Sequence, residues 1–251
     1  MRTISYLCVF LLIFESGYAF GFEPIPITIS GIMDKIVFDG KWTHEYEWKA
    51  SSLNTYEYEN DTQIVLRSAH QNDFVYIFLD PITDYSQDDL GDYAIVCFDT
   101  QNNKSAKPDL DDHCFMAYLN DKHSITYQGG HDSKKNGLSK VVNHEEFIGI
   151  STISDANDRY TPIPHPSYEF RIPTDLIGRS SVYGFYFEVY DKNTDKLHTY
   201  PENNSTIQNP ASWGEIYSPD KSLPEFDLPM IMLLPLLGLV IIMTKKIRLK
   251  N

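Results

Sequence analysis

Two cysteines and a run of aspartates in the middle of the chain are residue types that could do chemistry. The segment between Cys97 and Cys114 is sixteen residues long, and four of them are aspartates: Asp99, Asp109, Asp111 and Asp112. Calcium takes about six to eight oxygen ligands, which a flexible loop of carboxylates and backbone carbonyls can supply. The segment therefore predicts a calcium site, and a solvated acidic hairpin is the alternative.

A second acidic stretch lies just upstream. TDYSQDDLGD adds four carboxylates: Asp84, Asp88, Asp89 and Asp92. If both stretches lie at the same end of the fold, their mutual repulsion destabilises the protein unless a cation or solvent screens it. The twelve-residue calcium loop with glycine at its sixth position is absent, so the spacing alone does not decide. We expect calcium as the cofactor, with Asp88, Asp89 and Asp92 as further candidate ligands.

The two ends of the chain predict where this chemistry takes place. Arg2 is followed by an uncharged apolar run over residues 6–14, and Gly17 and Ala19 take the small-residue positions of a cleavage site. This pattern is typical of a secretory signal peptide, here residues 1–19.

The C-terminal pattern predicts a membrane anchor. Residues 228–244 carry no charge. The length of this segment is the short limit for a transmembrane helix. The basic tail 245–251 is expected on the cytoplasmic side. The bulk of the chain, residues 20–218, is then one domain on the outer surface of the cell, and residues 219–227 link it to the membrane.

Pro224-Glu225-Phe226, followed by an apolar span and a basic end, resembles the PEF-type C-terminal sorting signals of archaeal surface proteins. The resemblance implies that a transpeptidase-like membrane enzyme removes the span and attaches the protein to a surface anchor. A span that is retained as an ordinary single-pass anchor stays open as the alternative.

The charge composition limits the classes of partner that the chain can bind. The net charge is −14. The signal peptide is neutral and residues 224–251 carry +2, from four basic and two acidic side chains, so about −16 remains on the domain between them. Such a surface repels phosphate backbones, which argues against nucleic acid, and it suits cation binding or solubility outside the cell. We expect carbohydrate or cell-envelope components as partners.

The predicted export makes a disulfide and N-glycosylation possible. Cys8 lies in the signal peptide, and the even pair that remains, Cys97 and Cys114, predicts a disulfide. Four N-x-S/T sequons mark candidate glycosylation sites: Asn60, Asn103, Asn203 and Asn204.

The elements that must position these residues are strands. Runs such as QIVLRSAH (63–70), FVYIFLD (74–80), DYAIVCFD (92–99) and VYGFYFEVYD (182–191) are rich in Val, Ile, Tyr and Phe and are separated by Gly, Asn, Asp or Pro. FVYIFL is apolar on both faces, as expected of a central strand covered on both sides. The pattern predicts an all-β fold, a two-sheet antiparallel jelly-roll-like sandwich, with short helical turns at 43–48 and 173–177. IVFDG (36–40) is expected to be a further strand.

Several segments in order resemble the family 9 carbohydrate-binding modules and the related DOMON-like sandwiches. FDGKWTHEYEW matches their opening pattern through Asp39, Gly40, Glu45 and Trp48, and DYAIVCFD, YEFRIPTDLIG, VYGFYFEVYD and NPASWGEI resemble later strands. The resemblance spans about residues 33–217. It implies a jelly-roll-like sandwich that binds sugar or, in some branches, haem, and that holds structural calcium in several members.

Sugar-binding members of that family stack sugars on exposed aromatic rings. Trp48 and Trp213 fall at positions that the resemblance makes core-facing, so Trp42, Tyr85 and Tyr93 are the candidate platforms. This shortage of spare tryptophans is a departure from the family pattern. It favours a structural or adhesive envelope protein as the alternative function.

The sequence carries no signature of catalysis. It has no G-x-S-x-G, no P-loop and no dinucleotide fingerprint, so we expect a non-catalytic protein. His113, His123, His131 and His144 lack metal-site spacing. A metal or haem carrier, with Met116 and a histidine as axial ligands, is a second alternative.

Overall fold

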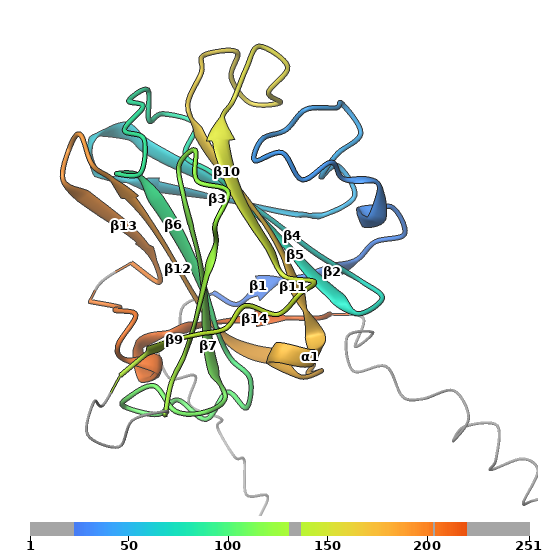
Figure 1. Cartoon of the computed structure of the whole chain (residues 1–251), viewed down its shortest axis with the longest axis vertical. Coiled ribbons are helices and arrows are strands. Elements are labelled where there is room, and N and C mark those ends of the chain that lie inside the picture. The colour runs from blue at the N-terminus through green and yellow to red at the C-terminus, as the bar shows by residue number, and fades with distance from the viewer. Residues whose placement is uncertain (1–22, 131–136, 203, 220–251) are drawn as a thin grey trace, which may run out of the picture.

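The structure is a computed structural model that describes residues 23–130, 137–202 and 204–219. Two β-sheets pack face to face, and the only helices in the described part are single turns (Figure 1). This confirms the predicted all-β, two-sheet architecture. The predicted signal peptide, the span 228–244, Pro224–Phe226 and the basic tail lie outside the described residues. Within those residues, no helix has both the length and the apolar character needed to cross a membrane.

One sheet, called sheet A, runs in the order β1-β14-β12-β6-β7-β8-β9, with β13 also paired to β12. Its strands are β1 Ile25–Pro26, β6 Tyr93–Asp99, β7 Asp112–Tyr118, β8 Ile125–Gln128, β9 Ser139–Val141, β12 Val182–Asp191, β13 Lys196–Tyr200 and β14 Gly214–Tyr217.

The other sheet, called sheet B, runs in the order β10-β11-β5-β4-β2, with β3 also paired to β4. Its strands are β2 Thr28–Ile29, β3 Ser52–Tyr58, β4 Thr62–Gln71, β5 Phe74–Asp80, β10 Ile148–Ile153 and β11 Pro166–Pro173. The short helices are η1 Met33–Lys35, η2 Glu59–Asp61, α1 Thr174–Ile177 and η3 Pro210–Ser212. Helix α1 confirms the turn expected at 173–177.

The core between the sheets follows from period-two alternation. Val75, Ile77 and Leu79 of β5 face Phe185 and Phe187 of β12 in one buried cluster. Neighbouring residues of each strand point to the outer face. Because burial of apolar area is the main favourable term in folding, this shared cluster holds the sandwich together.

The outer face of sheet B is also covered. The segment 31–51 lies along it and packs Met33, Trp42 and Trp48 onto Tyr76 and Phe78 of β5 (Figure 1). The strand β5 is therefore buried on both faces, as its sequence predicts. Residues 36–40 are not a strand: the prediction there is wrong, because this segment crosses the sheet surface instead of pairing at its edge.

The first described residues connect the two sheets. Strand β1 pairs with β14 of sheet A, and β2, two residues later, pairs with β4 of sheet B. Both pairings are parallel, so the predicted antiparallel arrangement holds for the other strand pairs and not for these two short ones.

The predicted disulfide is present. Cys97 of β6 and Cys114 of β7 are direct cross-strand partners and are bonded to each other. Both are fully buried on the outer face of sheet A, where Tyr186 and Trp213 cover them. The acidic segment is thereby a closed loop between two adjacent strands.

Candidate functional site

The two acidic stretches lie at opposite ends of β6. Asp92 precedes the strand and Asp99 ends it, so the strand separates the upstream stretch from the disulfide loop. The condition under which eight carboxylates would crowd together is therefore not met. Each stretch forms its own environment.

In the disulfide loop the carboxylates bind the loop itself. The two carboxylate oxygens of Asp99 accept hydrogen bonds from the backbone N–H groups of Asn103 and Lys104. Asp111 accepts one from the N–H of Gln101, and Asp112 accepts one from the N–H of Asp109. Local bonds of this kind fix the course of the loop.

The carboxylates of this loop still repel one another. Burial raises the pKa of Asp112 to about 7 and that of Asp111 to about 6, and neighbouring aspartates add to both shifts. A hydrogen bond from the Asp111 side chain lowers the pKa of Asp109. Within the described residues, these side chains do not converge as a group of three metal-ligating atoms. Calcium in this loop stays a prediction.

The upstream stretch does contribute to such a group. Asp84, Asp92 and Asp191 place one carboxylate oxygen each within 4.8 Å of the others. Asp84 follows β5, Asp92 precedes β6, and Asp191 ends β12. The loop after β5 of sheet B therefore meets the ends of two strands of sheet A at this place. Burial raises the pKa of Asp84 to about 6 and also raises that of Asp92.

A buried tyrosine hydroxyl approaches the same group. Tyr168 of β11 is completely buried, and its hydroxyl has no hydrogen-bond partner. Burial and the charges of Asp92, Asp84 and Asp191 hold the pKa of Tyr168 well above its usual range. A cation with bound water would supply both the positive charge and the hydrogen-bond partner that this place lacks. The donor set of three carboxylates fits calcium.

The other upstream candidates lie outside this group. Asp88 donates its backbone N–H to Asp92, and the exposed carboxylate of Asp89 accepts a hydrogen bond from the side chain of Asn120. Asp191 was missing from the sequence prediction. The only sequence feature that marks Asp191 is its position at the end of a strongly β-forming run. It lies more than a hundred residues after Asp84.

A cleft of about 650 Å³ opens beside the carboxylate group. It is lined by Asn60 of the β3–β4 connection, by Asp84 and Tyr85 of the loop after β5, and by Asn193 and Lys196 of the β12–β13 hairpin. This volume lies within the range of about 300–1,000 Å³ for ligand sites. The ring of Tyr85 is 54% exposed, so it presents an open aromatic surface to a ligand.

The other two platform candidates differ from Tyr85. Trp42 is only 1% exposed: it packs against Phe78 and Tyr160, and the guanidinium of Arg67 lies 5.6 Å from its ring centroid. No face of Trp42 is open to a sugar, and we therefore do not retain it as a platform. Trp42 was a candidate because the resemblance places Trp48 and Trp213 in the core, but the segment 31–51 folds back over sheet B and buries Trp42 as well.

Tyr93 belongs to a row of tyrosines on the outer face of sheet A. Its ring stacks on Tyr190 of β12, with centroids 5.1 Å apart, and meets Tyr118 of β7 edge-on. All three rings are partly exposed. Tyr93 therefore packs between two other tyrosines and does not line the Tyr85 cleft.

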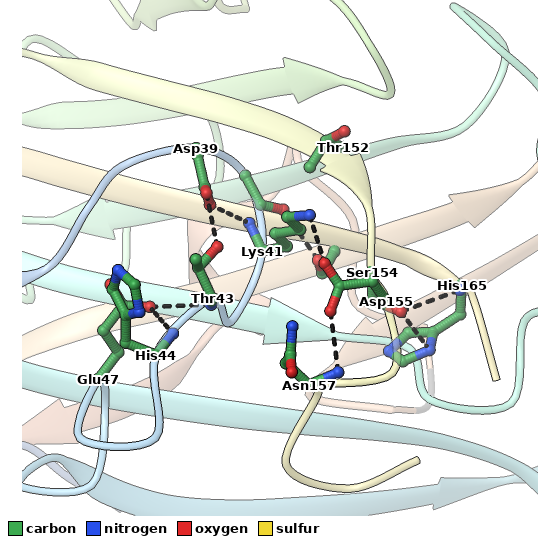
Figure 2. A network of polar contacts seen from close by, with 12 residues as sticks. Asp39, Lys41, Thr43, His44, Glu47, Thr152, Ser154, Asp155, Asn157 and His165 are labelled. Carbon is green, nitrogen blue, oxygen red and sulfur yellow. Dashed lines mark hydrogen bonds and ion pairs between the residues drawn. The ribbon is translucent and has the colours of Figure 1, made fainter. Parts of the chain in front are cut away.

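The opening motif FDGKWTHEYEW organises the segment 31–51 through hydrogen bonds to carboxylates, part of which Figure 2 shows. The buried carboxylate of Glu169 accepts hydrogen bonds from the backbone N–H groups of Asp39 and Gly40 and from the indole N–H of Trp48. Glu47 accepts from the N–H groups of Thr43 and His44. Glu45, which the resemblance selects, is instead exposed and pairs with Lys49.

Three of the four sequons can be located. Asn60, Asn103 and Asn204 are exposed, and Asn203 lies outside the described residues. The side chain of Asn103 donates to Asp109 and so is part of the disulfide loop. Met116 is buried beside the disulfide.

Comparisons with known proteins identify no family for the chain. No family model matches it, and no curated protein matches it. Two solved structures of a family 9 carbohydrate-binding module from Caldicellulosiruptor kristjanssonii are similar at 16% identity. The one in complex with cellotriose has a TM-score of 0.46 and covers 82% of this chain and 100% of that chain. The one in complex with glucose has a TM-score of 0.48 and covers 78% of this chain and 95% of that chain.

Proposed function

We propose that this chain is a non-catalytic carbohydrate-binding module at the outer surface of the cell, and that the cleft at Tyr85 is its binding site. The observation that carries the proposal is the combination of one open aromatic ring with amide, carboxylate and ammonium side chains around a single cleft. Sugars present apolar C–H faces and equatorial hydroxyls. The ring packs against the former, and the polar groups hydrogen-bond the latter.

The surroundings of the cleft make it a rigid site. Asp191 accepts hydrogen bonds from the backbone N–H groups of Asn193 and Thr194, which fixes the β12–β13 turn. Asp84 accepts from the N–H and the hydroxyl of Ser86, which fixes the loop that carries Tyr85. Preorganised groups lose little entropy when a ligand binds, so a small set of contacts is enough to bind a sugar.

Tyr85→Ala is expected to reduce glycan binding at least tenfold, because it removes the ring face of the cleft. The measurement is a glycan panel followed by calorimetric titration of the best ligand against the full-length chain. Tyr46→Ala is the matched control, since Tyr46 is 50% exposed but lies on the segment 31–51. Binding that is unchanged in Tyr85→Ala, or equally reduced in both variants, would contradict this assignment.

We further propose that calcium binds at Asp84, Asp92 and Asp191, in place of the disulfide loop. At pH 7.5 calcium is expected to raise the melting temperature and a chelator to lower it, at constant ionic strength. The carboxylates must be ionised to bind the ion, and the pKa of Asp84 is raised to about 6. The calcium effect should therefore shrink as the pH falls from 7.5 to 5.

Asp92→Asn separates this site from the disulfide loop. The variant should lose the calcium response, while Asp109→Asn should keep it. Equal melting temperatures of the unmodified chain with calcium and with chelator would remove the calcium proposal and leave the cleft proposal standing.

The row Tyr93, Tyr118 and Tyr190 supports the alternative of a structural or adhesive envelope protein. A flat, partly exposed tyrosine surface suits contact with another protein, because these rings bury large area at low entropy cost. In that case the glycan panel is negative on folded protein. Anchoring through the C-terminal segment, with or without removal of the span, belongs to both proposals.

A further inference from the structure

A third polar cluster lies on the outer side of sheet B and shares no residue with the carboxylate group beside the Tyr85 cleft. Asp80 ends β5, His165 directly precedes β11, and Asp158 lies in the loop between β10 and β11. One ligand atom from each of the three lies within 4.8 Å of the others. Asp80 and His165 are completely buried, although an aspartate and a histidine are rarely placed so deep without a role.

The hydrogen bonds of His165 decide which of its nitrogens carries a proton. Its Nδ1 lies 2.7 Å from the carbonyl oxygen of Ile163, which can only accept, so Nδ1 must donate. Nδ1 also lies 2.8 Å from the hydroxyl of Ser154 (Figure 2). In the neutral ring the lone pair is therefore on Nε2, and Nε2 points at Asp80 Oδ1, 2.8 Å away.

This arrangement excludes a serine-activating role for His165. A base for the Ser154 hydroxyl would need its lone pair on Nδ1, the nitrogen that donates to Ile163. The arrangement instead matches metal-binding histidines, whose second ring nitrogen donates to a backbone carbonyl and so fixes the tautomer and the ring orientation.

Two carboxylate oxygens beside Nε2 have no hydrogen-bond partner. Both Asp80 Oδ2 and Asp158 Oδ2 are buried from solvent and unpaired. The other oxygen of Asp158 accepts from the backbone N–H groups of Tyr160 and Thr161, which holds the side chain in place. Leaving two buried carboxylate oxygens unpaired is costly. A cation that displaces the proton between Nε2 and Asp80 Oδ1 would satisfy both oxygens and use the lone pair of Nε2.

One ligand of this cluster faces a surface hollow. Asp158 lines a depression of about 390 Å³ together with Asn157, Arg159 and His44. Asp158 therefore lies between this hollow and the completely buried Asp80 and His165.

We propose that Asp80, Asp158 and His165 bind a divalent transition-metal ion of the Zn²⁺ class. One imidazole nitrogen and two carboxylates suit zinc, which accepts nitrogen and oxygen ligands and takes four in all, so water completes the set. Calcium prefers oxygen ligands only. Two ligand atoms on a tetrahedral zinc lie about 3.4 Å apart, so His165 and Asp80 need to separate slightly on binding. The ion connects the β10–β11 loop to the end of β5.

The test uses the full-length chain, stripped of metal and kept in excess calcium so that oxygen-only sites are filled. Co²⁺ is the probe, because a tetrahedral site gives it visible d–d absorption that Zn²⁺ then removes. We expect one Co²⁺ per chain. Asp158→Asn should weaken its binding at least tenfold, and His165→Gln should abolish it.

Two variants serve as controls. His123→Gln removes the histidine of an exposed His–Asp pair with Asp121 and should bind Co²⁺ like the unmodified chain, and so should Asp84→Asn. Asp158 is only partly buried, so its variant keeps the test valid if His165→Gln fails to fold. Absence of Co²⁺ binding by the folded, metal-free chain would overturn the proposal and leave a buried His165–Asp80 ion pair. Unchanged binding in Asp158→Asn would overturn it as well.

Discussion

Glu169→Ala is expected to lower the free energy of unfolding by about 3–5 kcal/mol. The carboxylate is buried and holds three donors at once, the backbone N–H groups of Asp39 and Gly40 and the indole N–H of Trp48. Alanine leaves the Gly40 N–H and the Trp48 indole N–H buried and unpaired, while the Asp39 N–H keeps a bond to the carbonyl of Val37. It also loosens Trp48, which is stacked on Phe78. The measurement is urea unfolding followed by tryptophan fluorescence.

The size of the effect depends on burial, so an exposed acid of the same segment is the control. Glu45→Ala removes only an exposed surface pair with Lys49 and should leave stability nearly unchanged. Glu169→Gln keeps one acceptor oxygen and should fall between the two. Equal stability of the Glu169→Ala and Glu45→Ala variants would show that the segment 31–51 is not held through Glu169.

Loss of the disulfide is the second large effect. Replacing both Cys97 and Cys114 by alanine should cost about 3 kcal/mol, because the unfolded chain regains the freedom of the closed loop. For a domain of this size, that is a fall in melting temperature of about 6–12 °C. Differential scanning calorimetry checks it.

The location of the bond gives this prediction a control. Both sulfurs lie under Tyr186 and Trp213, so mild reductant at neutral pH should leave the folded protein intact and act only near its melting temperature. A double alanine variant that melts within 2 °C of the unmodified chain, measured under the same conditions, would contradict the loop-entropy account.

Strand positions could be predicted because they depend on local pattern. The alternation in VYGFYFEVYD places Phe185 and Phe187 in the core, and the two-sided apolar run FVYIFL marks a strand covered on both faces. The disulfide could be predicted from the cysteine count and the predicted export alone. These features need no knowledge of which strands are neighbours.

Site residues depend on topology, and there the sequence was less informative. Asp191 meets Asp84 only because β12 lies opposite the loop after β5, and His165 meets Asp80 only because β11 pairs with β5. The dense aspartates of the disulfide loop gave the stronger sequence signal, yet they bind their own backbone. Trp42 and Trp48 look alike in sequence, and the fold buries both of them.

The segment that joins the two sheets determines how late in synthesis the sandwich can be completed. Ile25 of β1 pairs with Ile216 of β14, so one of the first described residues to leave the ribosome needs one of the last. Contacts of such sequence separation form late, after local hairpins such as β4–β5 and β6–β7. A nascent chain therefore lacks this closure until β14 has been made. An unclosed chain is also the form that a translocation pore accepts, so this order of synthesis suits the export that the N-terminal pattern predicts.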